Sequence, residues 1–513
     1  MTMIFIHARA APALAPALLA ALLAGCAAGP DYVRPPLALP TRYTAEPVAG
    51  EAAHAPPSAD ADGVPVQRLS PTLDIPAQWW AVFHSAPLDD WVRASLAHNS
   101  DVAAAQAALR AAQENTAATA AAFWPTLDAS YQPSRQKIAG TLASPLASNA
   151  NLYNLHTAQL TVSYAPDVFG GVRRSVEAAR AQEDQQRFQL EASQLALSAN
   201  VVVAAINEAS LRAQREATLA IIESQRQVLR DYRRQLELGQ VAPADVDAQE
   251  AALAVTEATL PPLDKQLAQQ RNQLLVLAGR YPSQDIDAHF DLDALELPAE
   301  LPLVLPSALV EHRPDVLAAE AQLHAASAGI GVAVAARLPS VLLGVNAYGS
   351  SATSLSQLFT SSSMFWTLAA GVTQPLFDGG ALQHREAAAR AGFEQNAAQY
   401  RSTVLGAFQD VANALQAIDA DTHALRAALA AERATAKTLD RTRAQLRLGD
   451  ASAMAVLLAQ QAWQQAVLNL VQAKAARLTD TAALFQALGG GWWNRPDGAV
   501  AAEGEATSAQ RLR

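Results

Sequence analysis

The feature that most constrains this chain is a very long segment without helix-breaking residues. Residues 171–237 contain no proline and no internal glycine. At 1.5 Å per residue, a helix over this segment would be about 100 Å long, and helices of globular proteins rarely exceed about 25 residues. Apolar residues step through it by four and three positions: Leu195, Ala199, Val202, Ile206, Ala209 and Ala213. This heptad spacing predicts a coiled coil with another long helix.

The same features return about 210 residues later, which indicates an internal repeat. A second long helix is expected over 380–447, with its own heptad seam: Val404, Phe408, Val411, Leu415, Ile418, Leu425 and Leu429. We place the first repeat at 87–280, the second at 306–490, and a proline-rich linker at 281–305. Two copies of a unit this large predict a pseudo-symmetric protomer, because a solenoid needs more and shorter repeats.

Each long helix is followed by a glycine turn and a return helix. Gly239 and Gly449 stand where a left-handed residue usually ends a helix. Return helices are expected over 244–278 and 452–487, so each repeat forms an antiparallel helical hairpin. Leu260-Pro261-Pro262 interrupts the first return helix. We interpret it as the end of one helix and the start of another, with proline in its first turn.

Four segments between the helices alternate between polar and apolar residues, as strands do. They lie at 125–132, 158–164, 340–348 and 365–374, within hairpins over about 123–168 and 337–376. Their connecting loops, 139–157 and 350–363, are rich in Ser, Asn, Thr and Ala. Such strands resemble transmembrane β-hairpins, with soluble hairpins as the alternative. Four strands cannot close a barrel and lipid does not tolerate open sheet edges, so several protomers would have to share one barrel.

A short apolar run near the N-terminus ends in Leu23-Ala24-Gly25-Cys26, and Cys26 is the only cysteine of the chain. This pattern is typical of the lipobox of bacterial lipoproteins. It predicts removal of residues 1–25 and acylation of Cys26, whereas the alternative is a buried free cysteine. No aspartate follows Cys26 to indicate retention at the inner membrane. Beyond this signal no apolar run reaches the length of a spanning helix, so strands would have to cross the membrane.

Composition and motifs exclude several classes of function. The net charge of −11 argues against a nucleic-acid partner. A hydrophobic content of 51% with only 6% aromatic residues favours long helices packed through small side chains. Gly329-Ile330-Gly331 lacks the third glycine of a dinucleotide site, and zinc-protease and phosphate-loop motifs are missing from the sequence. We therefore expect neither catalysis nor a cofactor beyond the lipid on Cys26. A non-channel periplasmic tether would explain the lipobox and the heptads, but not the strand hairpins.

Several stretches together resemble the outer-membrane efflux protein family, the TolC-like exit ducts, in its lipoprotein subgroup. They are Cys26–Tyr32 with Arg34-Pro35, Trp79-Trp80 with Phe83, Leu305-Pro306-Ser307 leading to Arg313-Pro314-Asp315-Val316, and Ala487–Trp492. The resemblance implies a homotrimer with one shared 12-stranded transmembrane β-barrel, four strands per protomer. It also implies a periplasmic α-helical barrel closed at its far tip, where a membrane-fusion adaptor docks and couples the duct to an inner-membrane transporter of the resistance-nodulation-division type.

The resemblance also suggests where the functional residues lie. The tip would be formed by Leu238, Gly239, Gln240, Leu448, Gly449 and Asp450. Where family members often carry an acidic residue nine positions after the second glycine, this chain has Leu458. We therefore expect a hydrophobic constriction of Met454 and Leu458, rimmed by Asp245, Asp247 and Asp450. The alternative is that Leu458 packs in the coiled coil and the aspartates are solvated residues at helix starts.

Three further segments complete the expected organisation. Residues 26–86 would carry the lipid and run extended along the periplasmic body, and 281–305 would contribute to a belt around the tube. The tail over 491–513 is rich in Gly, Ala and Glu and is expected to be disordered.

Overall fold

The computed structural model describes residues 28–37, 39–44, 67–144, 146, 148–286 and 288–495. The predicted signal 1–25, Cys26 and the tail beyond Arg495 lie outside the described residues. The chain divides into two compact units. The sheet unit comprises the N-terminal segment up to Pro35, Leu109–Gln186 and Ala319–Tyr400; the hairpin unit comprises the remainder.

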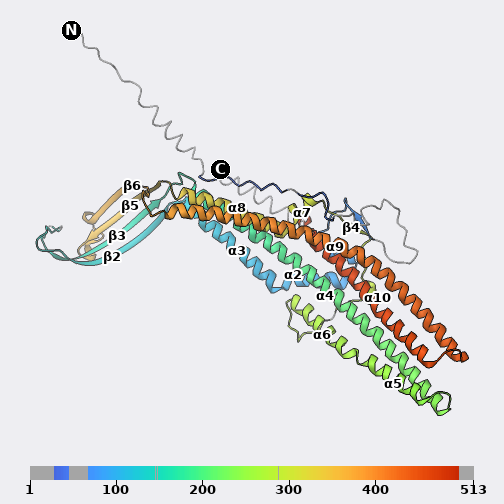
Figure 1. The fold of residues 1–513 in the computed structure, drawn as a ribbon. Helices are drawn as coiled ribbons and strands as arrows, with labels where there is room; N and C mark the ends of the chain where they lie inside the picture. Colours follow the sequence, from blue (N-terminus) through green and yellow to red (C-terminus); the bar gives the residue numbers. More distant parts are fainter. Residues whose placement is uncertain are drawn as a thin grey trace, which may run out of the picture. The chain divides into compact units, whose positions relative to one another are not determined.

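The sheet unit contains one four-stranded antiparallel sheet in the order β2-β3-β5-β6 (Figure 1). Its strands are β2 (Thr126–Lys137), β3 (Leu152–Tyr164), β5 (Ser340–Ala352) and β6 (Met364–Thr373). The β3–β5 pairing joins the two halves of the sequence, while β2 and β6 have no second strand partner among the described residues. Three strands extend further from the helices than predicted, because polar residues such as Asn154 and Ser351 continue the ladder. The loops are correspondingly shorter than expected.

The register separates the sheet into an apolar face and a polar face. Pairs such as Leu127 with Val162, and Val345 with Leu368, lie on the first, and pairs such as Asp128 with Thr161 on the second. The apolar face comprises Leu127, Ala129, Tyr131, Ala158, Leu160, Val162, Val341, Leu343, Val345, Trp366, Leu368, Ala370 and Val372. The polar face includes Thr126, Asp128, Ser130, Gln159, Thr161, Ser163, Asn346 and Thr367.

In the sheet unit, the N-terminal segment packs on the helices that adjoin the sheet. Arg174 of α4 is buried, forms ion pairs with Asp31 (2.6 Å) and Glu177 (2.7 Å), and donates to the carbonyl oxygen of Ala28 (3.2 Å). Gly29 has a φ of +88° and its backbone lies directly against that of Gly331 on α8 (Pro314–Ala335), where a side chain would collide. The chain that follows Cys26 is therefore held at specific contacts from Ala28 onward.

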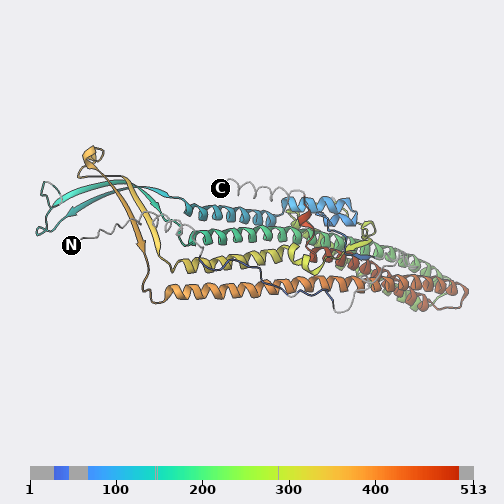
Figure 2. The ribbon, with the colours of Figure 1, turned by 90° about the horizontal axis from the view of Figure 1, so that it is seen from above.

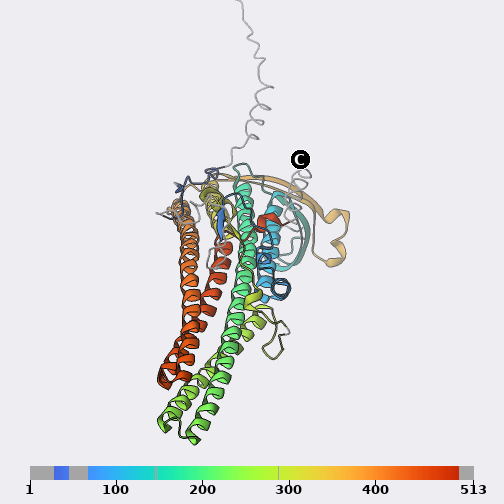
Figure 3. The ribbon, with the colours of Figure 1, turned by 90° about the vertical axis from the view of Figure 1, so that its right-hand side faces the viewer.

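The hairpin unit is built from two helical hairpins that lie side by side (Figures 1 and 3). The long helices are α4 (Gly171–Glu237) and α9 (Ala381–Leu448), and both also contribute to the sheet unit. Their return helices are α5 (Pro243–Glu257) with α6 (Leu260–Leu277), and the single α10 (Ala453–Ala487). Pro261 and Pro262 occupy the first turn of α6, as predicted. The shorter helices are α2 (Ala86–His98), α3 (Ser100–Ala120), which spans both units, and α7 (Pro306–His312).

Most of the predicted heptad seam is buried within the protomer. On α4 these residues are Ala199, Val202, Ile206 and Ala209; on α9 they are Val404, Val411, Leu415, Ile418 and Leu425. Small and β-branched side chains at these positions let neighbouring helices approach closely, as expected from the low aromatic content.

A short parallel pair of strands connects two distant segments of the hairpin unit. β1 (Arg68–Ser70) pairs with β4 (Glu300–Pro302), so the segment before the first repeat meets the linker between the repeats. Next to it Trp79 is buried and stacks on Phe485 of α10, with ring centroids 5.7 Å apart. The stacking holds the segment before the first repeat against the last helix of the second repeat.

One described helix differs from the prediction that no apolar run beyond the signal is long enough to span a membrane. An 18-residue window within Gly171–Glu237 is apolar enough to cross a membrane by length and composition, although 44% of it is buried inside the protein. Core helices of soluble proteins meet the same criterion, so this window is weak support for a spanning helix.

Candidate functional site: sheet face and hairpin tips

The apolar face of the sheet is uncovered within the sheet unit. Leu127, Leu368 and Trp366 are 68%, 70% and 75% exposed. A soluble protein rarely leaves an apolar surface this extensive in contact with water. Exposed aromatic residues bound it on β2, with Trp124 just before the strand and Tyr131 within it. The four strands have 10 to 13 residues each, and a tilted strand needs about 9–11 to cross a bilayer. The face therefore matches a lipid environment in chemistry and in height.

Both long helices end in the same backbone motif. Gly239 (φ +71°) donates to the carbonyl of Leu236, and Gln240 donates to that of Gln235. Gly449 (φ +82°) and Asp450 repeat these bonds to Leu446 and Gln445. The pair of bonds around a left-handed glycine is a Schellman motif, which ends a helix sharply and turns the chain back. The predicted tip residues therefore lie on two equivalent tight turns, with Leu238 and Leu448 both exposed.

The return helices start differently in the two hairpins. The carboxylate of Asp245 accepts from the backbone N–H of Ala242 at 3.1 Å, next to Pro243 in the first turn. In the second hairpin the hydroxyl of Ser452 accepts from Ala455 at 3.2 Å. Asp245 thus caps the start of α5. Asp247 and Asp450 are exposed.

The two hairpins contact each other near their tips. Leu229, Tyr232 and Val246 form a buried cluster, and Ala453 at the start of α10 packs against it. Burial raises the pKa of Tyr232, and the neighbouring Asp245 carboxylate raises it further. This contact places the start of the second return helix beside the first hairpin.

The structure separates Met454 and Leu458 from the packing seam of the second hairpin. Their neighbours Val456 and Leu457 are buried, whereas Met454 and Leu458 are 51% and 59% exposed. Positions 454 and 458 are one helical turn apart and share a face of α10. Leu458 therefore does not pack inside its own hairpin, and its place in a constriction stays a prediction. The exposed Met454–Leu458 face is available to a lumen or to a neighbouring subunit.

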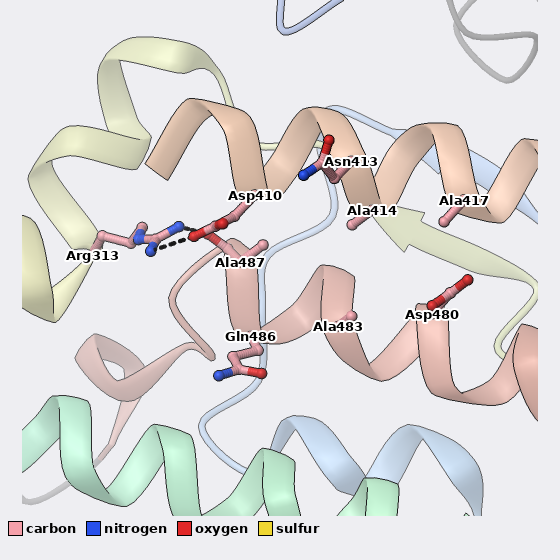
Figure 4. A pocket seen from close by; sticks show the side chains of 9 residues that line it. All are labelled: Arg313, Asp410, Asn413, Ala414, Ala417, Asp480, Ala483, Gln486 and Ala487. Atoms are coloured by element: carbon pink, nitrogen blue, oxygen red, sulfur yellow. Dashed lines mark hydrogen bonds and ion pairs between the residues drawn. The ribbon is translucent and has the colours of Figure 1, made fainter. Parts of the chain in front are cut away.

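A cavity of about 360 Å³ opens between the middle of α9 and the C-terminal end of α10 (Figure 4). At one end Arg313 forms ion pairs with Asp315 (2.7 Å) and Asp410 (2.8 Å) and donates to the carbonyl of Ala487 (3.2 Å). The other end is formed by Asp480. Arg313 thus ties the start of α8 to both helices of the second hairpin, which gives a physical role to the Arg-Pro-Asp stretch.

Asp480 also belongs to a charged cluster around the buried Arg477, which the sequence analysis missed. Arg477 of α10 is 2% exposed and donates to Gln67 (2.8 Å), to the carbonyl of Ile418 (2.6 Å) and to Thr422. Burial, and then a hydrogen bond with Asp480, raise the pKa of Asp421 to about 6. A signal existed in the sequence, because Arg477 and Thr481 stand at heptad-spaced positions with Leu484 and Leu488.

We predict that Asp421→Asn flattens the pH dependence of stability. The folded pKa lies above the unfolded value, so protonation of Asp421 favours the fold. This contribution is present in full below the unfolded pKa and is lost as pH rises through about 6. The variant should melt at a higher temperature than the wild type at pH 7.5, by a smaller margin at pH 5, and at a similar temperature only below the ordinary carboxyl pKa of 3.8. Thermal melts followed by circular dichroism would measure this, with Asp440→Asn, an exposed position of α9, as control.

No group of three His, Cys, Asp or Glu side chains in the described part of the chain is arranged to hold a metal ion.

Comparisons with known proteins agree with this geometry. The profile of the outer membrane efflux protein family matches residues 91–280 and 305–490. The pyoverdine export outer membrane protein OpmQ of Pseudomonas putida is 29% identical over 421 residues, which are 81% of this chain and 88% of that protein. The cation efflux system protein CusC of Escherichia coli is 27% identical over 477 residues, 91% and 96% of the two chains.

Solved structures share the fold. The outer-membrane channel OprN superposes with a TM-score of 0.80 at 25% identity, over 91% of this chain and 100% of that one. The Campylobacter jejuni outer membrane channel CmeC gives 0.81 at 20% identity, over 94% and 98%, and at that identity it supports the fold alone.

Proposed function

The chain belongs to the outer membrane efflux protein family, and from this premise we propose that it is the outer-membrane exit duct of a tripartite efflux pump. Members of this family are channels rather than enzymes. The observation that carries the proposal is the sheet with one exposed apolar face, one polar face and two unpaired edge strands. A sheet of this kind suits a barrel wall with lipid outside and water inside.

Closure of the barrel requires further copies of the chain. The edges β2 and β6 are unpaired in the described protomer, and an unpaired edge is not tolerated in lipid. Three protomers with four strands each would give 12 strands, within the range of known membrane barrels. We therefore propose a homotrimer in which β2 of one protomer pairs with β6 of the next. The two matches of the family profile support the internal repeat.

We further propose that the protein is anchored in the outer membrane by lipid on Cys26. The support is the lipobox sequence and the docking of Ala28 beside Phe169, to which it donates at 2.9 Å. Phe169 follows the end of β3 at Tyr164, so the anchored end leaves the protein near the sheet. Cys26 is two residues before Ala28, which is at most about 7 Å of chain. We propose that its lipid enters the membrane beside the end of the sheet that adjoins the helices.

The helical tips are proposed as the docking point of a periplasmic adaptor that leads to an inner-membrane transporter. The two equivalent turns present exposed apolar residues, Leu238 and Leu448, on short rigid loops. Exposed apolar side chains on rigid elements are typical of binding surfaces. Relatives are described as exporting pyoverdine, toluene or cations. We propose that this duct likewise conducts small molecules or ions passively, with the transporter selecting them.

A direct test combines channel recording with mass measurement on protein purified from outer membranes. A trimer by light scattering that gives discrete, mostly closed conductance steps in planar bilayers is expected. A monomer without conductance, which becomes extractable without detergent when Cys26 is replaced, would instead favour a periplasmic tether.

We predict that Leu458→Ser increases leak through the closed channel. Serine removes an exposed apolar side chain from the proposed constriction, so water and ions would enter it more readily. Closed-state conductance in planar bilayers measures the effect, with Leu253→Ala, which truncates a side chain packed against the buried cluster near the tips, as a control for general loosening. Leak no greater than that of the wild type would remove Leu458 from the gate.

A further inference from the structure

The sheet carries an unusual distribution of charge. Residues 124–164 and 338–377 contain only three side chains of the Asp, Glu, Lys or Arg type: Asp128, Arg135 and Lys137. Asp128 lies on the polar face. The two cations lie on β2, in a chain whose net charge is −11. Their shared strand and sign require an explanation beyond general solubility.

Both cations lie on the extension of the apolar face, beyond its end. Arg135 and Lys137 are at odd positions of β2, as are Leu127, Ala129 and Tyr131, so all five point to the same side of the sheet. Arg135 pairs with Asn154 and Lys137 with Leu152, whereas the β3–β5 pairing ends at His156. The cations therefore sit where only β2 and β3 continue, farther from the helices than the four-stranded part.

Tyr131 and His156, which lie between the apolar face and the two cations, are residues typical of a membrane boundary. Tyr131 is exposed and its hydroxyl is 2.8 Å from Nδ1 of His156. Amphipathic aromatic residues of this kind mark the level of the head groups. Arg135 lies four residues beyond Tyr131, which is about 13 Å along the strand. The order from the helices outward is thus apolar band, aromatic residue, cations.

Neither cation is neutralised by the protein. Both side chains are exposed, and in the part of the chain that the structure describes neither makes an ion pair or a side-chain hydrogen bond. The β2–β3 loop and the β5–β6 loop contain no charged residue in the sequence. A cation just above a lipid surface is best compensated by the phosphate of a head group, which accepts charge-assisted hydrogen bonds.

We propose that Arg135 and Lys137 form a docking site for the phosphate groups of lipopolysaccharide, the phosphorylated glycolipid of the outer leaflet. The inference rests on the proposed function, because it requires the apolar face to lie in the membrane and the β2–β3 hairpin to reach outward. The arginine fork would hold one phosphate by paired hydrogen bonds, and the lysine, one rung further, would add a point charge.

A different explanation is that charges on an edge strand prevent pairing between sheets of different molecules. That explanation predicts a change in assembly when the charges are removed, but no change in lipid binding. The two explanations therefore separate in one experiment.

The test uses the full-length protein in detergent and rough lipopolysaccharide as the probe, with bound lipid counted by native mass spectrometry. Arg135→Gln with Lys137→Gln should weaken binding about tenfold or more, from the loss of charge-assisted bonds. The matched control, Arg110→Gln with Lys265→Gln, removes the same two charges from exposed positions on α3 and α6 and should bind as the wild type does. Arg135→Lys with Lys137→Arg should retain binding.

Two further measurements test which part of the lipid is bound and whether the protein forms a channel. Dephosphorylated lipopolysaccharide should bind weakly to all variants, and inorganic phosphate should not compete. Equal binding by the wild type and the Arg135/Lys137 double variant, or full competition by inorganic phosphate, would overturn the proposal. Conductance is recorded in parallel: a conducting variant with unchanged lipid binding refutes the lipid site alone, whereas absent conductance in the wild type refutes the proposed function.

Discussion

Replacing Leu368 by arginine is expected to remove the protein from the outer membrane. Leu368 lies in the middle of β6, on the apolar face, and is 70% exposed. If this face contacts lipid, an arginine near the middle of the bilayer costs about 2–4 kcal/mol in each protomer. A trimer would experience that cost three times. Fractionation of outer membranes and gel assays of the assembled oligomer should show little inserted protein.

The neighbouring residue supplies a matched control. Thr367 pairs with Asn346 on the polar face, so Thr367→Arg introduces the same side chain one position away but on the other side of the sheet. It should insert normally and alter the conductance and its preference for cations, because the new charge would face the lumen. Equal insertion of both variants would mean that the apolar face does not contact lipid.

The helical part of the fold could be predicted closely because its signals are local. These signals are the absence of proline, the heptad spacing and the glycine turns, and each depends on residues within a few helical turns. The expected long helix over 171–237 corresponds to α4. The break before Pro261 could also be predicted, because proline lacks the amide hydrogen that a helix interior needs. Packing between the helices then follows the seam residues.

The extent of the strands was harder to predict where the alternation of polar and apolar residues is weak and contacts with the neighbouring strand stabilise the pairing. Gly349 interrupts the alternation in β5, yet the ring of Phe365 from β6 lies over it and fills the space of a side chain. The register between β5 and β6 also shifts at this point. Such cross-strand compensation depends on residues far apart in sequence and has no local signature.

The environment of the proposed constriction residues could not be predicted from the sequence. The sequence around Leu458 is compatible with a packing seam or with a lumen, and in the structure its side chain is exposed on the protomer. Asp245 resembled a rim residue, but its carboxylate is bound to a backbone amide at the start of a helix. In both cases the alternatives differ in tertiary environment rather than in residue type.

Arg477→Ala should strongly destabilise the hairpin unit. The side chain is buried and joins Gln67, beside β1, to α9 through the carbonyl of Ile418 and the hydroxyl of Thr422. Removal of one partner from a buried charged network typically costs about 3–5 kcal/mol. Because membrane proteins often unfold irreversibly, the midpoint of helix loss at a fixed heating rate is the appropriate measurement. The control is Lys474→Ala, also on α10. It breaks an exposed pair with Asp293 of the linker and should cost about 1 kcal/mol or less.

The dependence of this loss on pH distinguishes an electrostatic role of Arg477 from simple packing. Arg477 lowers the pKa of Asp421, so its removal should raise that pKa further above the unfolded value. The Arg477→Ala variant should therefore be less impaired at pH 5 than at pH 7.5, where the Asp421 carboxyl ionises without a buried cation beside it. Adding Asp421→Asn to Arg477→Ala should restore part of the stability at pH 7.5, a coupling that a double-mutant cycle would measure. A loss that is the same at both pH values, with no recovery in the double variant, would assign Arg477 to packing and hydrogen bonding alone.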